Sequence, residues 1–306
     1  MTTLFTHGHA LIIGAGGDLP ATVSDAHGLA QILADPGRCA YPPGQVRLLV
    51  EASANRQAVL RALDDLAAAA GPEDTVVVAF SGHGYQVSLP IGETTYLMPY
   101  GYTLSRLPQT AISGAEFAAR LGAIRAGRLL ALLDCCHAGG LDGVKAPGLE
   151  LAPAPLPPEA LEMLQSGRGR ALIASSRAGE LSYAGSPYSV FTRAILEALC
   201  GLGAARQDGT VRVADLALYA GEVVPARSAG RQHPVLNFEQ ADNFALAYYA
   251  GGDPQPKALP FPPAEAPSPA PAAAPPAGQV QVGNISQVSH SQIIISTGDV
   301  IQGGKR

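Results

Sequence analysis

Short apolar runs alternate with longer segments of helical spacing through the first 250 residues, and this alternation limits the folds open to the chain. Residues 75–80 (TVVVAF) and 128–136 (RLLALLDCC) are near-continuous apolar runs, as expected of strands that are covered on both faces. Helical patterns such as residues 55–70 (NRQAVLRALDDLAAAA) separate such runs. The order predicts an α/β fold in which helices cover both faces of a mostly parallel sheet.

The composition changes sharply after residue 250. Residues 251–278 are rich in proline and alanine, which is typical of an extended, semi-rigid linker. Residues 279–306 are β-prone and carry no charge before Asp299. The sequence therefore predicts three parts: a folded domain over 1–250, a linker over 251–278 and a β-prone tail over 279–306.

Charge and hydropathy argue against several classes of protein. The net charge is −5, and the basic residues are mostly arginines that are scattered along the chain, so nucleic acid is not an expected partner. No apolar run approaches the roughly 18 residues of a membrane span, and the N-terminus lacks the pattern of a secretion signal. Four cysteines in 306 residues do not suggest a disulfide framework. We expect a cytoplasmic protein.

Two polar motifs follow predicted strands. Residues 81–84 (SGHG) come before a predicted hairpin at 85–100, and residues 134–137 (DCCH) end the apolar run that follows. His83 and Cys136 are thus predicted just past the carboxyl ends of two strands, where sheets of this kind bind ligands. A zinc site would need partner cysteines or histidines at metal-ligand spacing, which are missing, and a disulfide between neighbouring cysteines is no better supported. A cysteine and a histidine on neighbouring strands favour a thiol nucleophile.

Residues 14–20 (GAGGDLP) follow the first predicted strand, as a dinucleotide-binding loop would. The third glycine of that fingerprint is replaced by Leu19, so a tight turn is the favoured interpretation. Ser24 is predicted to cap the helix after this turn.

Together these motifs resemble the caspase-like cysteine peptidases, peptidase family C14, and in particular the bacterial metacaspase and orthocaspase branch. The resemblance extends from about residue 8 to residue 250. Besides SGHG and D-x-C-H-x-G, it covers three further segments: residues 24–26 (SDA), 189–192 (SVFT) and 232–236 (QHPVL). It implies a caspase-like three-layer sandwich with a six-stranded, mostly parallel sheet. Ala138 departs from the family, in which many members have serine there.

The resemblance implies a role for each residue of the two motifs. Cys136 would be the nucleophile, because it directly precedes the histidine of D-x-C-H, and Cys135 a packing residue. His83 would be the general acid and base that protonates the leaving amine. The backbone N–H groups of Gly84 and Cys136 would hold the oxyanion.

The resemblance also implies an acidic specificity pocket formed by Asp25, Asp134 and Ser81. Two carboxylates at a pocket floor select a guanidinium or an ammonium group, so we expect cleavage after Arg or Lys. Two other interpretations stay open: Asp25 as an acid in the first turn of a helix, and Asp134 as a cap at the end of a strand.

Members of this family often carry a processing linker after the catalytic cysteine, and residues 142–170 are long and proline-rich at that place. Lys145, Arg168 and Arg170 are the candidate sites for self-processing in it. No cofactor or metal site is expected from the residues; calcium activation is possible by resemblance only.

The tail contains residues 280–284 (VQVGN) within an uncharged, proline-free stretch of the kind that stacks into cross-β structure. This core resembles the amyloid signalling motifs of necroptosis adaptors and bacterial defence effectors. The resemblance implies recruitment by a receptor, or self-assembly, through residues 279–306. A disordered tail, or an edge strand on another domain, remains an equal alternative.

These observations predict a cysteine endopeptidase that acts in a bacterial stress or immune cell-death response. Its partners would be proteins or peptides with Arg or Lys at the cleavage site, including a gasdermin-like pore former. The alternative is a catalytically silent caspase-like scaffold that assembles partners through its C-terminal motif.

Overall fold

The computed structural model divides the chain into two units, Met1–Ala266 and Pro267–Arg306, each of which is described by itself. In the second unit, β12 (Ile293–Ile294) pairs with β13 (Val300–Ile301) in antiparallel fashion. The structure describes residues 4–89, 92–135, 150–154, 157–165, 168–204, 206, 208–237, 242–248, 255–260, 293–294 and 300–301.

A mostly parallel sheet forms the centre of the first unit, as predicted. Its six strands lie in the order β10-β8-β6-β3-β1-β2. Five of them run parallel, and β10 pairs with β8 in antiparallel fashion. The strands are β1 (Gly8–Gly14), β2 (Val46–Val50), β3 (Thr75–Leu89), β6 (Arg128–Cys135), β8 (Arg170–Ala174) and β10 (Val235–Asn237).

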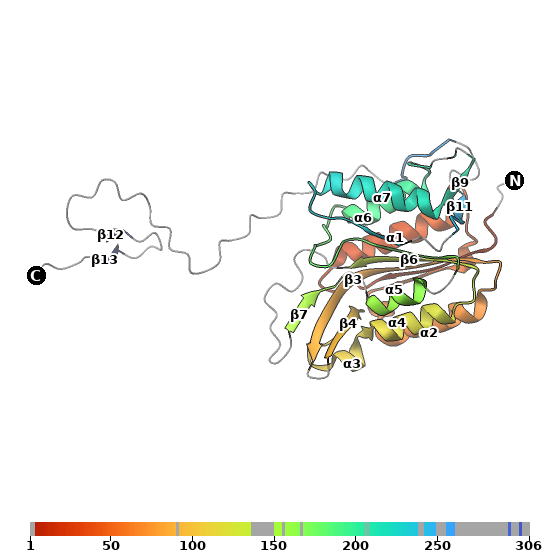
Figure 1. The fold of residues 1–306 in the computed structure, drawn as a ribbon. Helices are drawn as coiled ribbons and strands as arrows, with labels where there is room; N and C mark the ends of the chain where they lie inside the picture. Colours follow the sequence, from red (N-terminus) through yellow and green to blue (C-terminus); the bar gives the residue numbers. More distant parts are fainter. Residues whose placement is uncertain are drawn as a thin grey trace, which may run out of the picture. The chain divides into compact units, whose positions relative to one another are not determined.

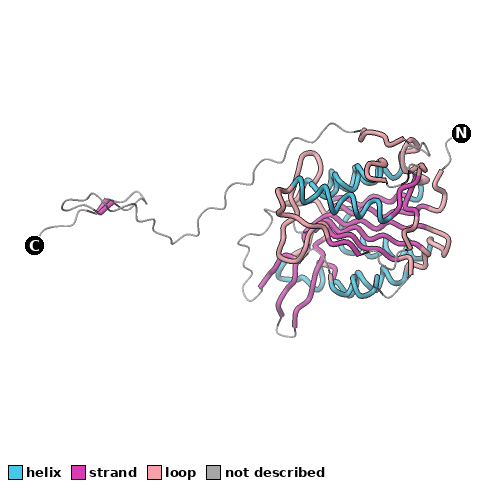
Figure 2. The backbone as a smooth tube through the Cα atoms, turned by 45° about the horizontal axis from the view of Figure 1, so that its top comes forward, coloured by secondary structure: helices cyan, strands magenta, loops and turns pink. Residues whose placement is uncertain are grey.

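Helices cover both faces of this sheet (Figure 1), and Figure 2 shows the strands as one layer between two layers of helices. Alternate residues of β1 face opposite sides: Ala10 and Ile12 pack in one apolar cluster, Leu11 and Ile13 in the other. This period of two follows from the strand geometry. The first cluster includes side chains of α1 (Pro20–Ala34), α6 (Val190–Leu199) and α7 (Val213–Arg227); the second includes side chains of α2 (Arg56–Ala69), α4 (Gly114–Ala123) and α5 (Pro158–Gln165).

Strand β3 changes its partners at His83. Up to Gly82 it pairs in parallel with β6, and from His83 onward it pairs in antiparallel fashion with β4 (Gly92–Met98). The predicted hairpin is confirmed, but the prediction that the strand ends before His83 is wrong. Apolar side chains beyond the parallel sheet explain the continuation, because Val87, Met98 and neighbouring residues form a third buried cluster. The shorter elements nearby are α3 (Leu107–Thr110), β5 (Ile112–Ser113) and β7 (Glu150–Pro153).

Helix α1 begins at Pro20, so the prediction of Ser24 as its N-cap is wrong. Leu19 occupies the N-cap position. Proline suits the first turn of a helix because its φ is already fixed and its missing N–H loses no bond there.

Residues outside the central sheet complete the first unit. Strands β9 (Thr210–Arg212) and β11 (Ala245–Tyr248) form a separate antiparallel pair. Residues 255–260, which lie in the predicted linker, are held against this unit: the N–H of Lys257 donates to the carbonyl of Cys200 at 3.1 Å. In the described part of the chain no helix is both long enough and apolar enough to span a membrane.

The packing of α1 on β1 gives a test of the fold. A Cβ atom at Gly14 would lie 2.4 Å from the carbonyl oxygen of Thr22 and 2.9 Å from the Cβ of Ala26. Gly14→Ala should therefore push the helix off the strand and lower the free energy of unfolding by about 1–3 kcal/mol, measured by urea denaturation. Gly44→Ala is the matched control, because a Cβ there meets nothing within 4 Å. Equal stability of the two variants would contradict this account of the packing.

Candidate active site

His83 is buried at the point where β3 leaves the parallel sheet, with 2% of its side chain exposed. Its Nε2 lies 2.8 Å from Oδ2 of Asp18, and its Nδ1 lies 3.4 Å from the hydroxyl of Tyr85. Asp18 follows the turn after β1, so two neighbouring strands bring these side chains together at the carboxyl edge. Sequence reasoning missed Asp18. The sequence signal for Asp18 is the pair of glycines before it, Gly16 and Gly17, because the turn that they form lies at that edge of the sheet.

A cleft of about 260 Å³ opens beside His83. It is lined by residues 15–18 of the turn, by His83 and by residues 98–102 that follow β4. The ring of Tyr102 stands nearly perpendicular to that of His83, with centroids 6.4 Å apart. Burial, and then the charge of Asp18, raise the pKa of Tyr102 to about 12, so this hydroxyl is neutral at physiological pH.

The three residues of the predicted acidic pocket come together. Asp25 on α1 and Asp134 on β6 are both buried, and Ser81 on β3 donates to Asp25 at 3.3 Å. Ser189, just before α6, joins the two carboxylates: its N–H donates to Asp25 at 2.9 Å and its hydroxyl donates to Asp134. Burial, and then the neighbouring charge of Asp134, raise the pKa of Asp25 well above its ordinary value.

Hydroxyl groups satisfy Asp134. Besides Ser189, it accepts hydrogen bonds from Ser182 at 2.7 Å and from Thr192 at 3.0 Å. Its position as the penultimate residue of β6, with three hydroxyl partners, is also what a strand-end cap would need. Asp25 differs, because α1 begins at Pro20 and has no acid in its first turn, so the helix-terminus interpretation is wrong.

A small cavity lies next to Asp134. It measures about 10 Å³, also touches Ser81 and Thr192, and is lined mostly by apolar side chains such as Phe191. Among the described residues, neither carboxylate is paired with a cation.

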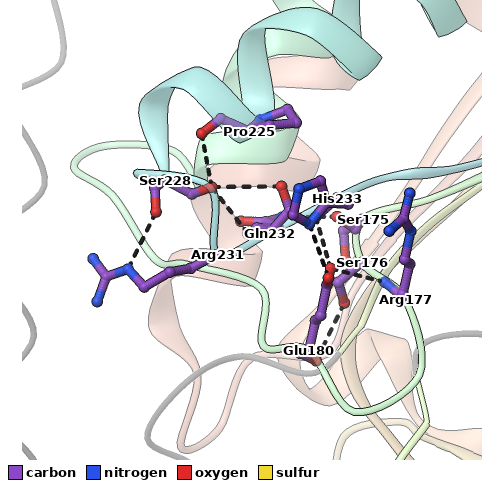
Figure 3. A network of polar contacts seen from close by, with 9 residues as sticks. All are labelled: Ser175, Ser176, Arg177, Glu180, Pro225, Ser228, Arg231, Gln232 and His233. Carbon is purple, nitrogen blue, oxygen red and sulfur yellow. Dashed lines mark hydrogen bonds and ion pairs between the residues drawn. The ribbon is translucent and has the colours of Figure 1, made fainter.

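A second polar network, which Figure 3 shows, supports the segment that carries Ser182. Gln232 donates from Nε2 to the carbonyl of Ser175 at 2.9 Å and to the hydroxyl of Ser182 at 3.2 Å. Glu180 accepts from the N–H of His233 at 2.7 Å and from its ring Nδ1 at 2.8 Å. Partial burial acts to raise the pKa of Glu180, but these donors outweigh it and hold the pKa below its ordinary value. The network connects the segment before β10 with the hydroxyls around Asp134.

Close packing explains the glycines of the SGHG motif. A Cβ at Gly84 would lie 2.4 Å from the carbonyl oxygen of Ala154, and a Cβ at Gly82 would lie 2.9 Å from the Cβ of Ala15. Cys135 is fully buried in the core, which agrees with its predicted packing role.

The described structure does not place several of the predicted residues at the site. Cys136, His137 and Lys145 are outside the described residues, so the nucleophile and its oxyanion N–H stay predictions. Arg168 is exposed, and Arg170 is the first residue of β8, where its guanidinium donates to the carbonyl of Ile124 at 2.7 Å. The structure does not bring either arginine to the carboxyl edge, because both lie at the amino end of β8.

The described residues contain no group of three or more His, Cys, Asp or Glu side chains that could hold a metal ion. Calcium activation stays a prediction from the resemblance.

Comparisons with known proteins agree with this architecture. No curated protein matches the chain. Among solved structures, the protein GSU0716 from Geobacter sulfurreducens is similar in fold, with a TM-score of 0.50 and 20% sequence identity over 75% of this chain and 92% of that one. The model of the caspase domain of peptidase family C14 matches residues 7–245. With a parallel sheet that carries His83 at its carboxyl edge, and with this match across most of its length, the chain belongs to the caspase-domain peptidase family.

Proposed function

We propose that the protein is a cysteine endopeptidase that cleaves after Arg or Lys, with Cys136 as nucleophile and His83 as general acid and base. The observation that carries the specificity is the pair of buried carboxylates, Asp25 and Asp134. Two anions in one buried site are costly unless a cation joins them. The side chain of a basic residue before the scissile bond would supply that cation, and its charge-assisted hydrogen bonds would favour it over an acidic residue.

The neighbouring groups support a proton-transfer role for His83. It lies beside an open cleft that can take an extended peptide, and its imidazole contacts an acid on one side and a hydroxyl on the other. In the proposed reaction, the Cys136 thiolate attacks the carbonyl carbon and protonated His83 gives its proton to the leaving amine. The resulting neutral imidazole then takes a proton from the water that hydrolyses the acyl-enzyme.

The biological setting rests on resemblance. We place the enzyme in the cytoplasm, in a bacterial stress or immune response, with a gasdermin-like pore former as one substrate and recruitment through residues 279–306. Lys145, Arg168 and Arg170 are the candidate sites of self-processing. Cleavage at Arg168 would act between molecules, since Arg168 is exposed and lies at the amino end of β8.

The adjacent cysteines give the first test. Cys136→Ala should abolish the hydrolysis of fluorogenic peptides with Arg before the reporter group, because the nucleophile is lost. Cys135→Ala is the matched control and should keep most of the turnover, with a loss of stability of roughly 1 kcal/mol from the buried volume removed. Activity that survives in Cys136→Ala and disappears in Cys135→Ala would assign the nucleophile to the other cysteine.

The acidic pocket gives a second test, because it predicts opposite effects on activity and stability. Asp25→Asn should lower kcat/KM for Arg substrates roughly tenfold to a hundredfold, as a charge-assisted hydrogen bond is lost. The raised pKa of Asp25 means that its ionisation destabilises the fold once the pH exceeds the pKa of a free carboxyl. The variant should therefore unfold at a higher temperature than the wild type at pH 7, and this gain should vanish below the ordinary pKa of 3.8.

Asp208→Asn is the matched control for this variant, since it removes a surface carboxylate that is paired with Arg212. It should leave kcat/KM unchanged. If peptides with Asp before the scissile bond are cleaved and those with Arg or Lys are not, the assignment of the pocket fails.

The alternative of a silent scaffold predicts a different outcome in active-site titration. An arginyl chloromethylketone should alkylate the wild-type protein with a stoichiometry of one label per chain, detected by intact mass, and should leave Cys136→Ala unlabelled. Absence of labelling in the wild type, together with intact folding, would favour the scaffold.

A further inference from the structure

The contact between Asp18 and His83 is not explained by any role assigned so far. Oδ2 of Asp18 lies 2.8 Å from Nε2 of His83, which is hydrogen-bond distance. Asp18 lies in the turn after β1 and His83 in β3, 65 residues apart in the sequence, so the contact depends on the tertiary fold. The carboxylate of Asp18 is half exposed, whereas the imidazole is buried.

Hydrogen bonds and two glycines shape the turn that carries Asp18. Gly16 and Gly17 have φ values of +67° and +70°, in the left-handed region that favours glycine. Thr22 closes the turn: its hydroxyl accepts from the N–H of Gly16 at 2.8 Å and donates to the carbonyl of Leu19 at 2.7 Å. The N–H of Ala15 donates to the carbonyl of Ser81 at 2.9 Å, which ties the turn to β3. Asp18 is therefore presented to His83 by the backbone.

The chemistry of the contact fixes the tautomer of the imidazole. An ionised carboxylate can only accept hydrogen bonds, so Nε2 of His83 must carry a hydrogen. In the neutral ring Nδ1 then holds the lone pair and is the nitrogen that exchanges protons with the reacting groups. When Nδ1 gives its proton to the leaving amine, one N–H bond breaks, one forms on the amine, and Nε2 keeps its hydrogen throughout.

We propose that Asp18 is a positioning residue that holds His83 in the Nε2–H tautomer and stabilises its protonated form through the 2.8 Å contact. This inference rests on the proposed function, in which His83 is the general acid. Asp18 acts on His83 and not on the substrate, so its effect is on the protonation of the imidazole.

The other ionisable groups described around His83 do not replace this charge. The hydroxyl of Tyr85 faces Nδ1 at 3.4 Å, and Tyr102 lies across the cleft with its pKa raised to about 12, chiefly by burial. The hydroxyl of Tyr102 is therefore neutral at the pH of catalysis. Asp18 is the charged group in contact with the ring among the described residues.

Asp18→Asn tests the proposal, because it keeps the shape of the side chain and removes the charge. A general acid is active in its protonated form, so kcat should fall as the pH rises through the pKa of His83. Without the carboxylate the imidazolium is less stable, and the alkaline midpoint of kcat should move to lower pH by about half a unit to one unit. At a pH above both midpoints kcat should drop roughly threefold to tenfold, with little change in KM.

Two further variants control for charge and for structure. Asp18→Glu restores the charge on a longer arm and should return the midpoint at least halfway to that of the wild type. Glu51→Gln removes an exposed acid that packs against the same turn but does not line the cleft, and should leave the pH profile unchanged. If Asp18→Asn raised KM for basic peptides without moving the midpoint, Asp18 would be a substrate-binding acid, and the proposal would be overturned.

A measurement without turnover separates this inference from the proposed function. In full-length Cys136→Ala, the His83 imidazole can be titrated by NMR, with its signals assigned by their loss in His83→Ala. Adding Asp18→Asn should lower the pKa of His83 by about half a unit to one unit. An unchanged pKa would overturn the positioning role even if the enzyme is active. If the wild type shows no peptidase activity, the proposed function fails, and this titration still decides whether Asp18 controls the protonation of His83.

Discussion

The register between β1, β3 and β6 is the constraint on which the site depends. Gly14 pairs with Ser81, and Ser81 pairs with Asp134, so three neighbouring strands are level at their carboxyl ends. The pairing of Gly82 with Cys135 then sets the position at which β3 changes partners. A shift by one residue would turn each side chain to the opposite face of the sheet. The arrangement of His83, Ser81 and Asp134 is thus a consequence of strand pairing.

The same register creates an electrostatic cost that other parts of the fold offset. Asp25 and Asp134 are buried near each other, and the pKa of Asp25 is raised first by burial and then by Asp134. Hydroxyl and backbone donors from the segment before α6 satisfy both carboxylates, and Gln232 braces that segment against the end of β8. Hydroxyl groups therefore surround Asp134, and no cation is paired with it among the described residues.

The sequence predicts the parts of this molecule that depend on pattern and local motifs. The alternation of apolar runs and helical segments predicts the parallel sheet, and the polar motifs at the ends of two runs identify Ser81, His83 and Asp134 as neighbours. What it cannot predict depends on tertiary contacts. The sequence misplaces the start of α1, because Ser24 has the residue type of an N-cap although it lies inside the helix that begins at Pro20. The sequence predicts that the strand ends before His83, because the apolar run stops at Phe80. In the structure, pairing with β4 continues the strand to Leu89.

For the same reason, the sequence does not predict the hydrogen-bond partners of the site residues. Ser182 reaches Asp134 from a loop whose course is set by its contacts with Gln232, far along the chain. Asp18 belongs to a segment that local reasoning explains completely as a glycine turn. Only the pairing of β1 with β3 shows that this turn points an acid at His83. Asp18 lies in the turn before α1 and Asp25 lies within α1, yet the Asp18 carboxylate is half exposed beside an imidazole and the Asp25 carboxylate is buried near a second acid. The two side chains are of the same residue type, so their surroundings alone make the two carboxylates chemically different.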